Sequence, residues 1–174
     1  MISEQAKQAF GREGVVGPFP LLHPERVADL LTAHPKLSGK RNQHTHSAEV
    51  RAVIADHNLA QAVSALCADD LILWRSAFFY KKTGSGELGW HHDKHYQSES
   101  AQAVRFDEMN QHFSVLIALN PINAASGQIE IIPGTHLEDA RYRRDPRPIY
   151  VRPDESHFLT DIPNALLATR RALD

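Results

Sequence analysis

Residues 78–93 read FFYKKTGSGELGWHHD, and residues 112–136 read HFSVLIALNPINAASGQIEIIPGTH. The first block starts with aromatic residues that end a β-leaning run. A glycine-rich turn follows, and the block ends with Trp-His-His-Asp. The second begins with an apolar run that stops at Asn120-Pro121, after which a short turn leads into the alternating run QIEI. Runs of this kind, joined by turns, predict the strands of an antiparallel sheet.

The chain before these blocks is predicted to be helical. Its apolar residues recur three and four positions apart, as on one face of a helix, and helix-capping residues precede the apolar runs. The signals are Ser3, Pro24 and Ser47 at the expected starts, and Gly11, Gly14 and Pro35 at the expected ends.

After the second block the chain becomes charged and rich in proline, which predicts a surface excursion. The last stretch, DIPNALLATRRALD, predicts a short helix that begins near Asp161 and Pro163. The sequence therefore predicts a mainly β fold with N-terminal helices, that is, an α+β domain or a β-barrel with helices outside.

The composition favours one soluble domain. The chain has 174 residues, 42% of them hydrophobic and 23% charged, and a net charge of −2, which gives no field for nucleic acid or an acidic membrane. No apolar run approaches the ~18 residues of a membrane span, and no signal peptide is recognised, so a cytoplasmic protein is expected. The single cysteine, Cys67, is expected to be a buried structural thiol.

His91 and Asp93 are the candidate metal ligands. Residues two apart on a strand project to the same face, about 6–7 Å apart at their Cα atoms. One imidazole and one carboxylate form two corners of the 2-His-1-carboxylate triad that binds iron(II), whereas zinc would require a fourth ligand or a water molecule. A solvated polar loop is the alternative, and the flanking strand patterns favour the metal site.

The two blocks together resemble the phytanoyl-CoA dioxygenase family. Members carry an aromatic-His-x-Asp element, then an apolar strand, then a Gly-containing segment that ends in Pro-Gly-Ser/Thr-His. The opening FGREGVVGPFPLL is also similar, so the resemblance covers roughly residues 5–137. It implies a double-stranded β-helix (jelly roll) and an oxygenase that depends on Fe(II) and 2-oxoglutarate, closest to the branch of amino-acid hydroxylases and halogenases.

The resemblance also assigns roles to single residues. It implies that His91 and Asp93 bind the metal, and that Lys81 and His92 lie at the 2-oxoglutarate site. For Lys81 a solvated lysine at a strand end is an equal alternative. In the halogenating branch a small residue replaces the carboxylate, so Asp93 favours hydroxylation. His136 is expected to be a hydrogen-bonded turn histidine.

The family also needs a second histidine on a later strand and an arginine roughly ten residues beyond it. His157 is the candidate ligand, followed by Arg170 and Arg171, but no apolar strand is predicted around them. The chain is therefore expected to end before the closing strands. Other histidines weighed as third ligand, but favoured as surface or supporting residues, are His95, His112, and the pair His44 and His46.

The predicted organisation is one partial oxygenase domain. A helical layer (1–68), jelly-roll strands (69–136) and a polar excursion with a short helix (137–174) follow one another. Open sheet edges would favour homo-oligomers. The expected function is Fe(II)/2-oxoglutarate-dependent hydroxylation of a small metabolite or amino-acid-like substrate. The alternative is an inactive truncated fragment, or a binding module of the same fold, without the third ligand.

Overall fold

The structure is a computed structural model. It describes residues 2–37, 41–67, 70–73, 75–84, 86, 88–91, 113–138 and 162–173. The α-helices there are α1 (Glu4–Glu13), α2 (Pro24–Leu37), α3 (Ala48–Ile54), α4 (His57–Leu66) and α5 (Asn164–Leu167). The 3-10 helices are η1 (Gln43–Thr45) and η3 (Thr135–Glu138), and the strands are β1 (Glu130–Ile131) and β2 (Arg171–Ala172). None of the helices in these ranges is long and apolar enough to cross a membrane.

Helix α1 begins as its capping residue predicts. The Ser3 hydroxyl accepts a hydrogen bond from the Ala6 N–H at 3.2 Å. The helix runs through Gly11 and ends at Gly14, whose φ of 78° is left-handed and whose N–H donates to the Phe10 carbonyl. The prediction that Gly11 breaks the helix was wrong, because one interior glycine costs only about 0.5–1 kcal/mol.

Helix α2 begins at Pro24, as predicted, and extends to Leu37. The prediction that Pro35 ends it was wrong. Proline in the last turn forgoes the one hydrogen bond that its missing N–H would donate, and its fixed φ is compatible with a helix. Helix α2 therefore tolerates the loss of this one bond and ends two residues later, at Leu37.

The expected third helical region forms two helices, each with a side-chain cap. The Ser47 hydroxyl accepts from the Val50 N–H at 3.2 Å, which confirms the predicted start of α3. The Asp56 carboxylate accepts from the N–H groups of Asn58 and Leu59 at 3.0 and 3.3 Å and begins α4. Each cap satisfies helix N–H groups that have no partner inside the helix.

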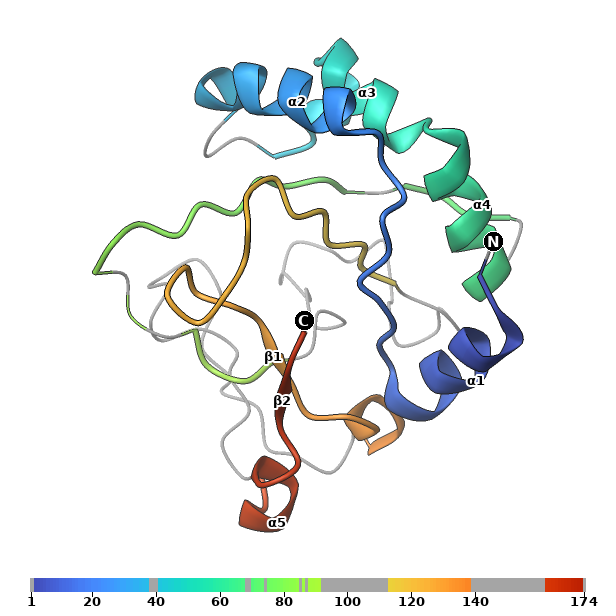
Figure 1. The fold of residues 1–174 in the computed structure, drawn as a ribbon, viewed down its shortest axis with the longest axis vertical. Helices are drawn as coiled ribbons and strands as arrows, with labels where there is room; N and C mark the ends of the chain where they lie inside the picture. The colour runs from blue at the N-terminus through green and yellow to red at the C-terminus, as the bar shows by residue number, and fades with distance from the viewer. Residues whose placement is uncertain are drawn as a thin grey trace, which may run out of the picture.

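The hydrophobic core lies on the inner side of the helices. Figure 1 shows these helices in an arc in the order α2, α3, α4 and α1, with extended segments beside it. The most buried side chains of this cluster come from α2, α3 and α4, and extended segments add Phe78, Ile117 and Leu119. The helical members are Leu30, Val50, Val53 and Leu59.

Only short strands form in the described part of the chain. β1 pairs antiparallel with β2, with Glu130 opposite Ala172 and Ile131 opposite Arg171. This confirms a strand within QIEI. Ala77 makes only an isolated bridge, with Arg41. The described residues of the other two runs, 71–82 and 113–119, are not assigned as strands, so the mainly β class is not confirmed.

The predicted C-terminal helix is confirmed only over its first part. Pro163 precedes α5, which spans four residues. The chain then turns, and Arg171 and Ala172 form β2, which brings the C-terminal segment alongside β1 (Figure 1). Local sequence signals start the helix, whereas pairing with a distant strand sets the conformation that follows it.

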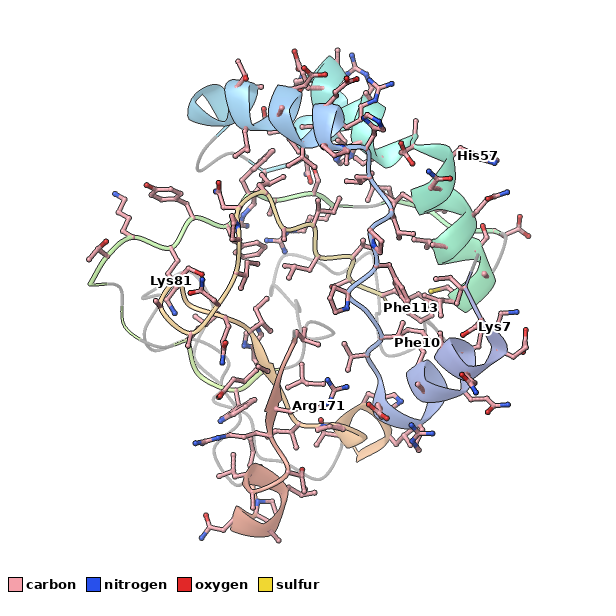
Figure 2. The ribbon with its side chains drawn as sticks, viewed as in Figure 1. Lys7, Phe10, His57, Lys81, Phe113 and Arg171 are labelled. Atoms are coloured by element: carbon pink, nitrogen blue, oxygen red, sulfur yellow. The ribbon has the colours of Figure 1, made fainter. Side chains whose placement is uncertain are left out.

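Two distant segments meet at the carboxyl end of α1. The Gly134 N–H donates to the Glu13 carbonyl at 2.9 Å, and the His136 ring nitrogen Nε2 lies 3.2 Å from the Gly11 carbonyl oxygen. The last carbonyls of a helix have no N–H donor inside the helix. The Pro-Gly-Thr-His turn supplies donors from outside and so caps α1. Further along, the rings of Phe10 and Phe113 lie 5.7 Å apart (Figure 2).

Candidate metal and co-substrate site

His91 is the part of the predicted metal site that the structure describes. Its Nδ1 lies 2.8 Å from the Gly89 carbonyl oxygen, and the side chain is half-buried. A carbonyl oxygen only accepts hydrogen bonds, so Nδ1 carries the proton. When the ring carries no second proton, its lone pair is on Nε2. Histidines that bind metals commonly donate their other ring N–H to a backbone carbonyl in this way.

The expected partners of His91 lie outside the described residues. This holds for Asp93 and His157 as metal ligands and for His92 as a co-substrate neighbour, and equally for the alternatives His95 and His112. Within the described ranges, no group of three or more His, Cys, Asp or Glu residues is arranged to hold a metal ion. The convergence of His91 and Asp93 stays a prediction.

Lys81, the expected co-substrate residue, is exposed and lies against a turn that precedes β1 (Figure 2). The contact is with Gly127, whose φ is 82°. A Cβ atom built on Gly127 would lie 2.5 Å from Lys81 Cδ and 3.2 Å from Lys81 Nζ. The lysine stem therefore occupies the space that any other residue at this position would fill.

His44 has a structural partner. Its Nδ1 lies 2.8 Å from the Ser76 hydroxyl, and the Asn42 N–H donates to the Ser76 carbonyl at 2.8 Å. These bonds fasten η1 and the residue before it to the extended segment around Ala77. They support the interpretation of His44 as a supporting residue, and His46 directly follows η1.

His136 is a hydrogen-bonded turn histidine, as predicted. Its Nε2 donates to the Gly11 carbonyl, and its ring packs so closely on Gly14 that a Cβ there would lie 2.4 Å from Nδ1. The ring fills the space beside a left-handed glycine at the end of α1. This position explains the residue without any role in metal binding.

The two arginines that follow the candidate ligand His157 in the sequence both lie near carboxylates. Arg171 Nη2 lies 2.8 Å from Glu13 Oε2, and Arg170 Nε lies 4.0 Å from Glu130 Oε2. Hydrogen bonds from Arg12 and then from Arg171 lower the pKa of the Glu13 carboxyl. Arg171 lies on β2, although no apolar strand is predicted there.

Cys67 is half-buried, so the expectation of a buried thiol was wrong in degree. It follows the last residue of α4, and its N–H donates to the Val63 carbonyl at 2.9 Å. Partial burial raises the pKa of the Cys67 thiol, which disfavours the reactive thiolate.

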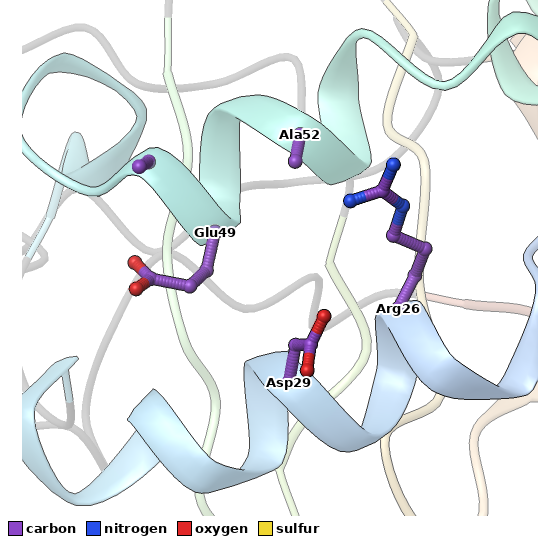
Figure 3. A pocket seen from close by; sticks show the side chains of 5 residues that line it. Arg26, Asp29, Glu49 and Ala52 are labelled. Carbon is purple, nitrogen blue, oxygen red and sulfur yellow. The ribbon is translucent and has the colours of Figure 1, made fainter.

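Two hollows in the described part of the chain lie among the helices. One lies between α2 and α3 and is lined by Arg26, Asp29, Ala48, Glu49 and Ala52 (Figure 3). The other shares Arg26 and Asp29 and adds His23, Glu25 and Asp56. Neither includes His91 or Lys81, and both are lined mainly by charged side chains. They are open surface features that differ from the mostly apolar pockets that enclose small ligands.

A protein-family model matches most of the chain. The model of the phytanoyl-CoA dioxygenase (PhyH) family matches residues 22–160, which is well over half of the chain. The chain therefore belongs to the phytanoyl-CoA dioxygenase family, as the resemblance indicated. Members of this family use Fe(II) and 2-oxoglutarate, so the family indicates oxygenase activity in general. No curated protein and no solved structure gives a significant match.

Gly127 was not predicted from the sequence as the neighbour of Lys81. The signal that could have indicated it is weak: a glycine that ends a turn directly before a strand often has a positive φ. Which side chain lies over that glycine depends on a contact across 46 positions of the chain, and no local pattern encodes it.

Proposed function

We propose that this chain is an Fe(II)/2-oxoglutarate-dependent oxygenase that hydroxylates an unactivated C–H bond of a small metabolite or amino-acid-like substrate. The proposed iron ligands are His91, Asp93 and His157. The observation that carries the proposal is the hydrogen bond between His91 Nδ1 and the Gly89 carbonyl, in a chain of this family. Because Nδ1 is engaged by this bond, Nε2 is the ring nitrogen proposed to bind the metal.

The proposed donor set suits iron(II). Two imidazoles and one carboxylate leave coordination positions for a co-substrate and oxygen. When bound, iron would activate oxygen, which is the oxidant: one oxygen atom would enter the substrate as hydroxyl, and the other would enter the succinate formed, with carbon dioxide, from 2-oxoglutarate. Asp93 favours hydroxylation, because a chloride ion would have to displace an anionic ligand.

The protein's own contribution is orientation and charge. The Gly89 carbonyl holds the His91 ring in one orientation. Lys81 carries a compact positive charge on a flexible stem, which suits binding of one carboxylate of 2-oxoglutarate. His92 is proposed to lie beside the co-substrate. A solvated lysine, the alternative for Lys81, would leave co-substrate affinity unchanged when the residue is replaced.

We further propose a cytoplasmic protein with a small-molecule substrate, no nucleic-acid or membrane partner, and self-association through open strand edges. Several exposed apolar side chains support the last point, among them Ile72, Phe79 and Leu88, which are 89%, 79% and 61% exposed. Sedimentation over a range of protein concentrations tests it. A monomer at every concentration would rule out self-association.

Metal and co-substrate binding test the proposed function. Anaerobic calorimetry with Fe(II), with and without 2-oxoglutarate, should give one site per chain, and oxygen should then produce succinate. His91→Ala, Asp93→Ala and His157→Ala should each weaken Fe(II) binding by at least about tenfold. A folded wild-type chain that binds neither Fe(II) nor 2-oxoglutarate would support the inactive alternative.

A further inference from the structure

Gly127 occupies a rigid turn next to the flexible Lys81 side chain. The Asn123 side-chain oxygen accepts from the N–H groups of Ala125 and Ser126 at 2.9 and 3.1 Å. The Ser126 hydroxyl lies 2.7 Å from the Asn123 N–H, which donates to it, and itself donates to the Pro121 carbonyl at 3.1 Å. These bonds hold the backbone of the turn that leads directly into Gly127.

The turn is also anchored to the sheet. The Gln128 N–H donates to the Asn123 carbonyl at 3.1 Å, and the Ile129 carbonyl accepts from the Leu173 N–H at 3.0 Å. β1 begins at the next residue, Glu130. The surface that Gly127 presents is therefore fixed relative to β1, whereas a lysine side chain has four rotatable bonds and loses much entropy when it is ordered.

A glycine surface lets the lysine stem lie directly on the backbone. The Lys81 Cδ and Cε atoms would lie 2.5 and 3.1 Å from a Cβ at position 127. Any side chain there would displace the stem, and the ammonium group at its end would move with it. Because the lysine is flexible, the stem can swing away at little cost in stability.

We propose that Gly127 is a positioning residue: it gives the Lys81 stem a flat seat on the Asn123–Gly127 turn and so sets where the ammonium group meets the co-substrate carboxylate. This inference rests on the proposed function for its co-substrate part. It assigns no contact between Gly127 and the co-substrate. The seat itself is a property of the chain with or without a ligand.

The test compares two alanine substitutions at left-handed glycines. Gly127→Ala introduces both backbone strain and the clash with Lys81. Gly84→Ala is the matched control, because Gly84 has a φ of 81° and nothing within 4 Å of the position of its Cβ. Backbone strain is thus common to both variants, and displacement of Lys81 is confined to one.

The first readout needs no ligand. A lysine-reactive succinimidyl ester labels the folded protein, and mass spectrometry gives the labelling of Lys81 relative to its neighbour Lys82. The ratio should rise by about twofold in Gly127→Ala, because the stem leaves the turn, and should stay unchanged in Gly84→Ala. An unchanged ratio in Gly127→Ala would overturn the inference.

The second readout is affinity for 2-oxoglutarate with Fe(II) present. Gly127→Ala should weaken it by about tenfold, the loss expected for one misplaced charge-assisted hydrogen bond, with Fe(II) affinity unchanged. Gly84→Ala should leave both affinities unchanged. In a Lys81→Ala background, Gly127→Ala should cause no further loss.

The outcomes separate the inference from the proposed function. Equal loss of 2-oxoglutarate affinity in the two glycine variants, or a further loss in the Lys81→Ala background, would contradict the positioning role. A wild-type chain that does not bind 2-oxoglutarate would instead refute the proposed function and the co-substrate role of the seat. The labelling ratio would still decide whether Gly127 places Lys81.

Discussion

At the residue scale, the carboxyl end of α1 is held by side chains from distant parts of the chain. His136 donates to the Gly11 carbonyl, and Arg171 joins Arg12 at the Glu13 carboxylate. A helix end carries unsatisfied carbonyls and a partial negative charge, which donors and cations stabilise. Because His136 and Arg171 lie more than 100 positions from α1, their contacts could not be predicted from sequence, although the hydrogen-bonded state of His136 could.

Glu13 should make stability depend on pH. Its pKa is lowered in the folded chain, so its contribution is fully present above the ordinary glutamate pKa and is lost as pH falls through the lowered value. Glu13→Gln should therefore lower the melting temperature at neutral pH and have no effect in strong acid. Melting curves from acid to neutral pH measure this. The gap between variant and wild type should be small, since surface ion pairs contribute little, and it should shrink at high salt.

Arg171→Gln should reproduce part of the same pH dependence, because it removes one of the two cations. Asp70→Asn removes an exposed carboxylate elsewhere and serves as the control. A Glu13→Gln gap that is constant with pH would show that the carboxylate's ionisation does not contribute to stability.

His136 and Gly14 should behave as a coupled pair. His136→Ala loses one hydrogen bond and should cost about 1 kcal/mol of unfolding free energy. Gly14→Ala places a Cβ 2.4 Å from His136 Nδ1 at a left-handed position and should cost more, about 2 kcal/mol or above. Combined with His136→Ala it should cost less than the sum, because the clash is gone.

Gly11→Ala is the matched control for this pair in urea unfolding. Nothing lies within 4 Å of a Cβ at Gly11, which is inside α1, so alanine should stabilise the chain by about 0.5–1 kcal/mol. Strict additivity of the Gly14 and His136 effects would show that the two residues do not touch in solution.

At the element scale, the helices of the described residues were largely predictable and the strands only in part. Ser3, Pro24 and Ser47 mark helix starts through bonds and dihedral angles within a few residues, so the information is local. A strand needs a partner along its whole length, and propensity alone cannot supply one. Ala77 therefore sits in an apolar, β-leaning run yet makes only one bridge, to Arg41.

Packing of helix α2 on its neighbours should account for much of the stability of the helical part. Leu30 is 5% exposed in the cluster formed with α3 and α4, so Leu30→Ala should lower the unfolding free energy by about 2–4 kcal/mol. Ile72→Ala is the control, because this side chain is 89% exposed and should change stability by less than about 0.5 kcal/mol. Equal losses, measured by urea unfolding, would contradict the expected difference in packing between Leu30 and Ile72.

At the scale of the whole molecule, the family and its oxygenase activity in general were predictable, and most of the site's geometry was not. The two sequence blocks indicated the phytanoyl-CoA dioxygenase family, which the family match confirms. His91 carries a backbone hydrogen bond that suits a metal ligand, whereas Asp93, His92 and His157 lie outside the described residues. Spacing along a strand predicts which side chains share a face, but a third ligand comes from a distant segment that only tertiary packing brings near.

The most direct measurement is the visible charge-transfer absorption of an iron(II)–2-oxoglutarate chelate, recorded without oxygen. Wild-type protein should develop the band when both are present, and His91→Ala should abolish it while the protein stays folded. His57→Ala, which changes an exposed histidine at the start of α4, should keep the band (Figure 2). A folded wild-type chain without the band, or a His91→Ala variant that retains it, would contradict the assignment of His91 as an iron ligand.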